Sequence, residues 1–215
     1  MTSPASGPEG LPRRVRIAAT VCLVLSILSG MLAGMEAYGL SDFSKYREAS
    51  LEPRRATLLG GDPVIAERLV EAQFSVLEPM REPRLVVLSV LGMSCMVAFV
   101  ASGRMLRPAG LPREGMRRML GGAALTAAVL RTIDGAQWTV VARRMGAVMA
   151  ESLGKMPEFQ DPLAADQMKQ MMPTLMAFGS ILQTALVAGT FALIGQYFRS
   201  QSVRDVITAQ DGPAE

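Results

Sequence analysis

Long apolar stretches dominate the pattern of hydrophobic and polar positions in this chain. Crossing the hydrocarbon core of a membrane takes about 20 residues of α-helix. Four stretches are long enough, and they cover about residues 17–40, 85–103, 119–141 and 174–198. We therefore predict an all-α membrane protein in which four transmembrane helices form a bundle.

The third stretch differs from the others because Arg131 and Asp134 lie inside it. A spacing of three residues puts both side chains on one helix face, where they can pair. Ionisable residues inside a span are costly and usually face the bundle interior or a water-filled cavity. Two interpretations stay open: a polar pathway or binding site, and a neutralised structural pair near the outer interface.

The other three stretches each offer a polar side chain at a depth similar to that of this pair. With a rise of 1.5 Å per residue from the flanking arginines, all five residues lie about 20 to 24 Å from the inner edge. One carboxylate cannot satisfy the five donors of an arginine, so further acceptors are needed. We predict a shared intramembrane polar layer made of Arg131, Asp134, Gln183, Ser29 and Ser89.

The distribution of arginines predicts the orientation. The connector 104–118 carries five arginines against one acid, Glu114, and both tails are also basic where they meet the apolar stretches. An excess of positive charge in short segments marks the cytoplasmic side of a membrane protein. We therefore expect both termini in the cytoplasm, and the loops 41–84 and 142–173 on the outer side of a bacterial inner membrane.

This orientation divides the chain into one membrane domain and two tails. We expect residues 17–199 to form the domain, and residues 1–16 and 200–215 to be disordered cytoplasmic tails. The first apolar stretch begins after several arginines, as a signal peptide does. It is longer than the 7–15 apolar residues of a signal peptide, so we predict an uncleaved helix.

Both outward loops carry a signal for the start of a helix. Asp62-Pro63 and Asp161-Pro162 each combine a capping residue with a proline suited to the first helical position. After the first signal, apolar residues recur at helical spacing over 63–78. We predict short amphipathic helices in the two loops, which either pack on the bundle as a cap or lie flat on the membrane surface.

Prolines and apolar positions add detail to these loop helices. In the helix over 63–78 we expect Ile65, Leu69 and Val76 to face protein. Prolines at positions 79 and 83 are expected to bend the chain before the second stretch, and a proline at 173 lies just before the fourth. Residues 41–59 also favour a helix, with a kink at Pro53.

Small residues form a stripe at helical spacing on the first stretch. Ser26, Gly30 and Gly34 follow one another at intervals of four residues. Such a stripe lets two helix backbones approach closely. It fits packing within the chain, and it also fits a face between two copies of the chain.

Composition excludes several kinds of chemistry. The chain has no histidine, which removes the commonest general base and transition-metal ligand. Its two cysteines, Cys22 and Cys95, lie in apolar stretches without a CxxC motif, so neither disulfides nor thiol redox chemistry are expected. Sixteen methionines fit irregular helix packing better than a Cu(I) site, and we expect no metal and no cofactor. A net charge of +3, held mostly in short flanks, predicts no nucleic-acid partner.

The function stays open between several classes of membrane protein. The sequence resembles no family, and the order of elements alone implies no function. The basic residues are 19 arginines and 3 lysines, a bias that we interpret as that of a GC-rich bacterial genome. We expect a non-enzymatic scaffold or accessory subunit of the bacterial envelope, with the bilayer, itself or another membrane protein as partner. The alternative is a small transporter or channel around Arg131 and Asp134, and an enzyme is the weakest hypothesis.

Overall fold

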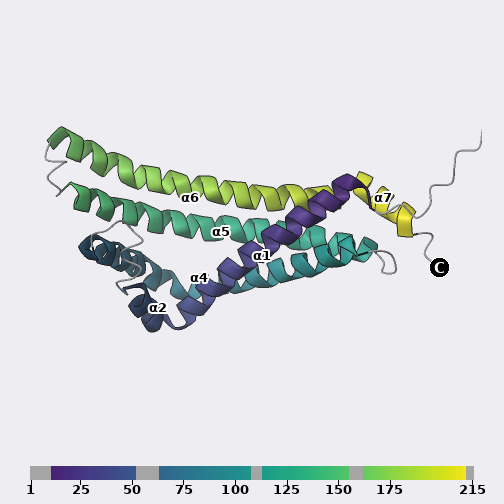
Figure 1. The fold of residues 1–215 in the computed structure, drawn as a ribbon, viewed down its shortest axis with the longest axis horizontal. Coiled ribbons are helices and arrows are strands. Elements are labelled where there is room, and N and C mark those ends of the chain that lie inside the picture. The colour runs from purple at the N-terminus through teal and green to yellow at the C-terminus, as the bar shows by residue number, and fades with distance from the viewer. Residues whose placement is uncertain (1–10, 52–62, 108–112, 155–161, 212–215) are drawn as a thin grey trace, which may run out of the picture. The chain divides into compact units, whose positions relative to one another are not determined.

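A computed structural model describes residues 11–51, 63–107, 113–154 and 162–211, and every regular element in these ranges is an α-helix. The elements are α1 (Arg13–Ser41), α2 (Phe43–Ser50), α4 (Pro63–Leu106), α5 (Arg113–Leu153), α6 (Pro162–Arg199) and α7 (Gln201–Asp211) (Figure 1). The all-α class expected from the sequence is confirmed. The capping positions Asp62 and Asp161 and the expected kink at Pro53 lie outside the described residues.

The helices group into two compact units. The first unit consists of Met1–Leu32, Val90–Val129 and Val187–Glu215, and the second consists of Ala33–Ser89 and Leu130–Leu186. Each of the four long helices contributes residues to both units.

The core of the first unit combines small side chains with larger apolar ones. Its fully buried residues include Ala19, Cys22, Leu91, Ala98, Leu120, Ala124 and Phe191. Ser26 is also buried, and a Cβ added to Gly30 would lie 3.1 Å from the Cβ of Cys95 on α4. Two of the three residues in the small-residue stripe therefore pack within the chain, whereas a Cβ on the third, Gly34, would meet nothing within 4 Å.

An ion-pair cluster stabilises the start of α5 in the first unit. Arg117 donates to the backbone carbonyl of Phe198 on α6 and to Glu114 one turn earlier. Arg117 contacts both oxygens of Glu114, and Arg118 also donates to Oε1 at 2.9 Å. Hydrogen bonds from Arg117 and Arg118 lower the pKa of Glu114 to about 2, so this carboxylate is ionised at neutral pH.

Aromatic side chains hold α2 against α4 in the second unit. Phe74 lies edge-on to Phe43 and Tyr46, with ring centroids 5.2 and 5.3 Å apart. The helix expected over 63–78 is present: Leu69 is buried, and Ile65 and Val76 are half-buried. The predicted face therefore packs against protein.

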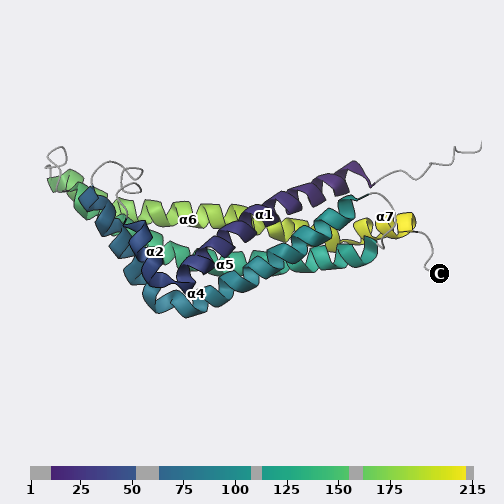
Figure 2. The ribbon, with the colours of Figure 1, turned by 60° about the horizontal axis from the view of Figure 1, so that its bottom comes forward.

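The loop helices are nevertheless not short and separate, and the structure corrects this expectation. Residues 63–78 continue through Pro79 and Pro83 into α4, and residues 162–173 continue through Pro173 into α6. A proline inside a helix removes one backbone hydrogen bond, but packing against neighbouring helices can hold the helix together around it. Figure 2 shows α4 bent within its N-terminal part, which contains Pro79 and Pro83.

The C-terminal segment also differs from the expectation. Residues 200–215 were expected to be disordered, whereas the structure forms α7 with Val203 and Ile207 buried. These two residues are one helical turn apart and give an otherwise polar helix a narrow apolar face. Burial of that face explains why a mostly polar segment is helical.

Among the described residues, three helices are long and apolar enough to cross a membrane: α1, α4 and α6. This finding fits a membrane protein. Although α5 has 41 residues, it is not among the three, and its central part carries the charges of Arg131 and Asp134.

Candidate functional site

Arg84 of α4 lies at the centre of a buried polar network in the second unit. Its side chain is 0% exposed, and each of its three nitrogen atoms donates a hydrogen bond. The acceptors are Glu36 Oε1 of α1 at 2.7 Å, Asp134 Oδ1 of α5 at 2.8 Å and Gln137 Oε1 of α5 at 3.1 Å. One guanidinium group thus connects three helices.

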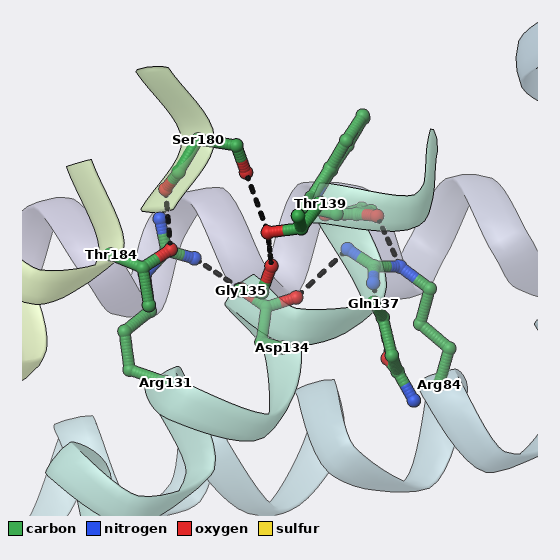
Figure 3. A network of polar contacts seen from close by, with 10 residues as sticks. Arg84, Arg131, Asp134, Gly135, Gln137, Thr139, Ser180 and Thr184 are labelled. Atoms are coloured by element: carbon green, nitrogen blue, oxygen red, sulfur yellow. Dashed lines mark hydrogen bonds and ion pairs between the residues drawn. The ribbon is translucent and has the colours of Figure 1, made fainter. Parts of the chain in front are cut away.

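A second arginine completes the charge balance. Arg131 pairs with Oδ2 of Asp134, so each oxygen of that carboxylate accepts from a different arginine. Figure 3 shows Arg84 and Arg131 approaching Asp134 from opposite sides. The Asp134 side chain is 0% exposed, and that of Arg131 is 17% exposed. Two arginines and two acids, Asp134 and Glu36, give the cluster no net charge.

Trp138 packs against the guanidinium group of Arg84. The guanidinium carbon lies 5.1 Å from the centroid of the indole ring, within the range of a cation–π contact. The indole nitrogen donates to Glu36 Oε2 at 3.4 Å, while Glu36 Oε1 accepts from Arg84. We call the six residues Glu36, Arg84, Arg131, Asp134, Gln137 and Trp138 the Arg84 network.

The helix α6 approaches the network through small and hydroxyl side chains. A Cβ added to Gly135 would overlap Thr184 Oγ1 and lie 2.6 Å from Thr184 Cβ. Thr139 on the next turn of α5 lies 3.4 Å from the hydroxyl of Ser180 (Figure 3). The glycine beside Asp134 therefore allows α5 and α6 to pack without a gap at this level.

The structure brings together only part of the polar layer expected from the sequence. Arg131 and Asp134 form the expected ion pair. Ser89 and Gln183 are exposed and do not reach the pair, and Ser29 is buried in the first unit. The physical reason is that a depth count fixes the height of a residue on its helix, whereas its direction depends on how the helix is rotated.

The acceptors and donors that surround Arg131 and Asp134 belong to residues that the depth count did not select. Glu36 was the one acid inside the first apolar stretch, and an ionisable residue there signals a site. Gln137 and Trp138 follow Asp134 by three and four residues and therefore share its helix face. Arg84 directly precedes the second apolar stretch, so it lies outside the stretches from which the polar layer was predicted.

The arrangement favours a structural role for these charges over chemistry. Both carboxylates are engaged by arginines, so neither is free to bind a cation or to serve as a general base. The described residues contain no group of three or more acids, cysteines or histidines that could hold a metal ion. One donor, Nε of Arg131, is buried without a hydrogen-bond partner.

Comparison of the chain with protein-family models, with curated proteins and with solved structures finds no match.

Proposed function

We propose that this chain is a non-enzymatic scaffold or accessory subunit of a bacterial inner membrane, built as a bundle of four transmembrane helices. The observation that carries the proposal is the internal neutralisation of the Arg84 network. Arg84 and Asp134 are both 0% exposed and bind each other at 2.8 Å. Charges arranged in this way lock helices together and leave both carboxylates occupied.

The fourth span of the proposal is α5. Arg131 and Asp134 make it less apolar than the other three helices, but both side chains have partners inside the protein. A charge that pairs within the bundle need not face lipid, which removes the main cost of placing it in a membrane. With 41 residues α5 is long enough, because about 20 residues suffice.

The alternative is a small transporter or channel that uses the same polar residues. Transport sites expose polar side chains to a water-filled cavity, whereas Asp134 and Arg84 are fully buried and mutually satisfied. Large apolar side chains face outward on α6, among them Met171, Leu175, Phe178 and Leu186. This surface suits lipid or the helix of a partner membrane protein, as a scaffold requires.

Cysteine labelling separates the two functions. We would replace Gln137 by cysteine in a Cys22→Ser/Cys95→Ala background and treat intact membrane vesicles of both orientations with a charged, membrane-impermeant maleimide. A dry network predicts no labelling at position 137. The control Lys45→Cys, at a side chain that is 81% exposed, should react from the outer side. Labelling of position 137 comparable to the control would favour the transporter or channel.

A further inference from the structure

A second polar feature of the second unit is an open cavity of about 500 Å³ between α5 and α6. On one side it is lined by Arg143 and Arg144 of α5. On the other it is lined by Lys169, Gln170 and Thr174 of α6. None of these residues belongs to the Arg84 network.

The charge of this cavity is strongly positive. Lys169 lies 3.8 Å from Asp166, and this is a long contact between exposed side chains. In the part of the chain that the structure describes, no carboxylate pairs with Arg143 or Arg144, and both side chains are exposed. Three cations thus stand against one acid, an arrangement that attracts an anion.

Close contact between the two helix backbones gives the cavity a fixed wall. A Cβ added to Gly146 would lie 2.7 Å from the Cα of Pro173 and 2.9 Å from the carbonyl oxygen of Met172. Pro173 also lines the cavity, and without an N–H it cannot donate the usual helix hydrogen bond to the Lys169 carbonyl.

The surroundings of the cavity combine this charge with apolar surface. Val140, which lines it, is 53% exposed, and Leu175, next to Thr174, is 64% exposed. In the proposed four-span arrangement the apolar stretch of α5 ends near 141 and that of α6 begins near 174. Arg143 and Arg144 then lie within one turn of the end of the α5 stretch, and Lys169 lies about one and a half turns before the α6 stretch, at the level of the lipid headgroups.

We propose that this cavity binds the headgroup of an anionic phospholipid. Arg143, Arg144 and Lys169 contact the phosphodiester, because guanidinium groups match phosphate geometry and the site carries excess positive charge. Gln170 and Thr174 hydrogen-bond to the polar headgroup, and an acyl chain lies along Val140 and Leu175. This inference rests on the membrane insertion in the proposed function.

The test measures lipid affinity of the full chain in detergent. Phosphatidylglycerol and phosphatidylcholine would be titrated separately, and the lipid-bound fraction followed by native mass spectrometry. Wild type should prefer phosphatidylglycerol, and Arg143→Gln/Arg144→Gln should weaken that binding about 30-fold, from the usual contribution of two basic residues beside anionic lipid. Arg143→Lys/Arg144→Lys keeps the charge but loses the planar guanidinium groups, so its affinity should lie between those of the double glutamine variant and wild type.

A matched control removes the same charge elsewhere in the second unit. Arg47 and Arg68 are exposed and do not line the cavity, so Arg47→Gln/Arg68→Gln should bind phosphatidylglycerol as wild type does. Unchanged binding by Arg143→Gln/Arg144→Gln, or an equal loss in the control, overturns the inference. Displacement of the lipid by an equal concentration of inorganic phosphate would indicate a site for a free anion and overturns it as well.

Membrane insertion is measured separately, by alkaline extraction of vesicles that contain wild type or Arg143→Gln/Arg144→Gln. Both should stay in the membrane fraction. Extraction of the wild type would contradict the proposed function. Retention of both chains without a difference in lipid affinity would overturn only the lipid site.

Discussion

The guanidinium group of Arg84 determines how polar residues of the second unit are arranged. Removing a charge from water costs several kcal/mol per ion, and attraction between partners offsets this only with good geometry and satisfied hydrogen bonds. Arg84 meets the condition because Glu36, Asp134 and Gln137 each accept from a different nitrogen atom. Asp134 meets it because each of its oxygens accepts from a different arginine.

Removal of the Asp134 carboxylate, which Arg84 and Arg131 share, should therefore lower the stability of the protein strongly. Asp134→Ala leaves Arg84 with one acid and Arg131 with none inside the network, and we expect a loss of about 3–5 kcal/mol in the free energy of unfolding. Ser89→Ala is the control, since Ser89 is exposed, and should change the free energy by less than about 0.5 kcal/mol. Unfolding by sodium dodecyl sulfate in mixed micelles measures both. Similar values for the two variants would contradict a structural role for the network.

Sequence reasoning could find the ion pair but not its surroundings. Arg131 and Asp134 lie three residues apart on one helix, so their contact depends only on local geometry. The contacts of Arg84 with Glu36 and Asp134 span 48 and 50 residues. They depend on the rotation of three helices, which no count of residues along one helix supplies.

At the scale of elements, α5 and α6 pack through glycines that meet the facing helix directly. The two helices run in opposite directions (Figure 1), and a Cβ on Gly135 or Gly146 would overlap α6 within the second unit. In the first unit a Cβ on Gly195 would lie 3.1 Å from the backbone oxygen of Gly121. The small-residue stripe that the sequence indicated lies on the first apolar stretch, so it includes neither Gly135 nor Gly146.

We expect Gly135→Ala to force α5 and α6 apart. The added methyl group would lie 2.6 Å from Thr184 Cβ, which side-chain rotation cannot move. Overpacking of this kind costs about 1–3 kcal/mol, to be measured by the same unfolding assay. The control Gly122→Ala lies on α5 with nothing within 4 Å of the new Cβ, and should be neutral or stabilising.

A second variant tests whether this contact is responsible. Gly135→Ala/Thr184→Gly transfers the glycine from α5 to the facing position of α6 and makes room for the methyl group. It should recover most of the lost stability, less about 1 kcal/mol for glycine inside a helix. No recovery would mean that Gly135 acts through something other than its contact with Thr184.

Local sequence predicts where helices begin, whereas packing with distant residues decides where they end. Pro63 and Pro162 begin α4 and α6, as the sequence predicts, because a proline at the first helical position depends only on its own backbone. Pro79 and Pro83 were expected to bend the chain before the second apolar stretch, and both lie inside a continuous α4, as Pro173 lies inside α6. Whether a proline ends a helix or only bends it depends on the packing around it.

At the scale of the whole molecule, the number of spans decides on which side of the membrane each segment lies. Among the described residues, three helices are long and apolar enough to cross, and in the proposed four-span arrangement the Arg84 network neutralises the charges of α5. With four spans both termini lie on the same side. With only α1, α4 and α6 crossing, the C-terminus lies opposite the N-terminus.

Reporter fusions distinguish these arrangements. With four spans, alkaline phosphatase fused near Asp62 or Asp161 should be active outside the cytoplasm. A fluorescent protein fused after Pro112 or at the C-terminus should fold inside it, on the same side as the arginines of the connector. With three spans the fusions near Asp161 and at the C-terminus exchange their results, while those near Asp62 and after Pro112 stay the same. An external C-terminus would therefore show that α5 does not cross the membrane, and a cytoplasmic result near Asp62 would contradict the orientation itself.

The Asp134→Ala variant tests whether the ion pairs of the Arg84 network are what allows α5 to cross. If pairing with Arg84 and Arg131 allows α5 to cross, loss of that carboxylate should lower the external signal of the fusion near Asp161 and leave the signal near Asp62 unchanged.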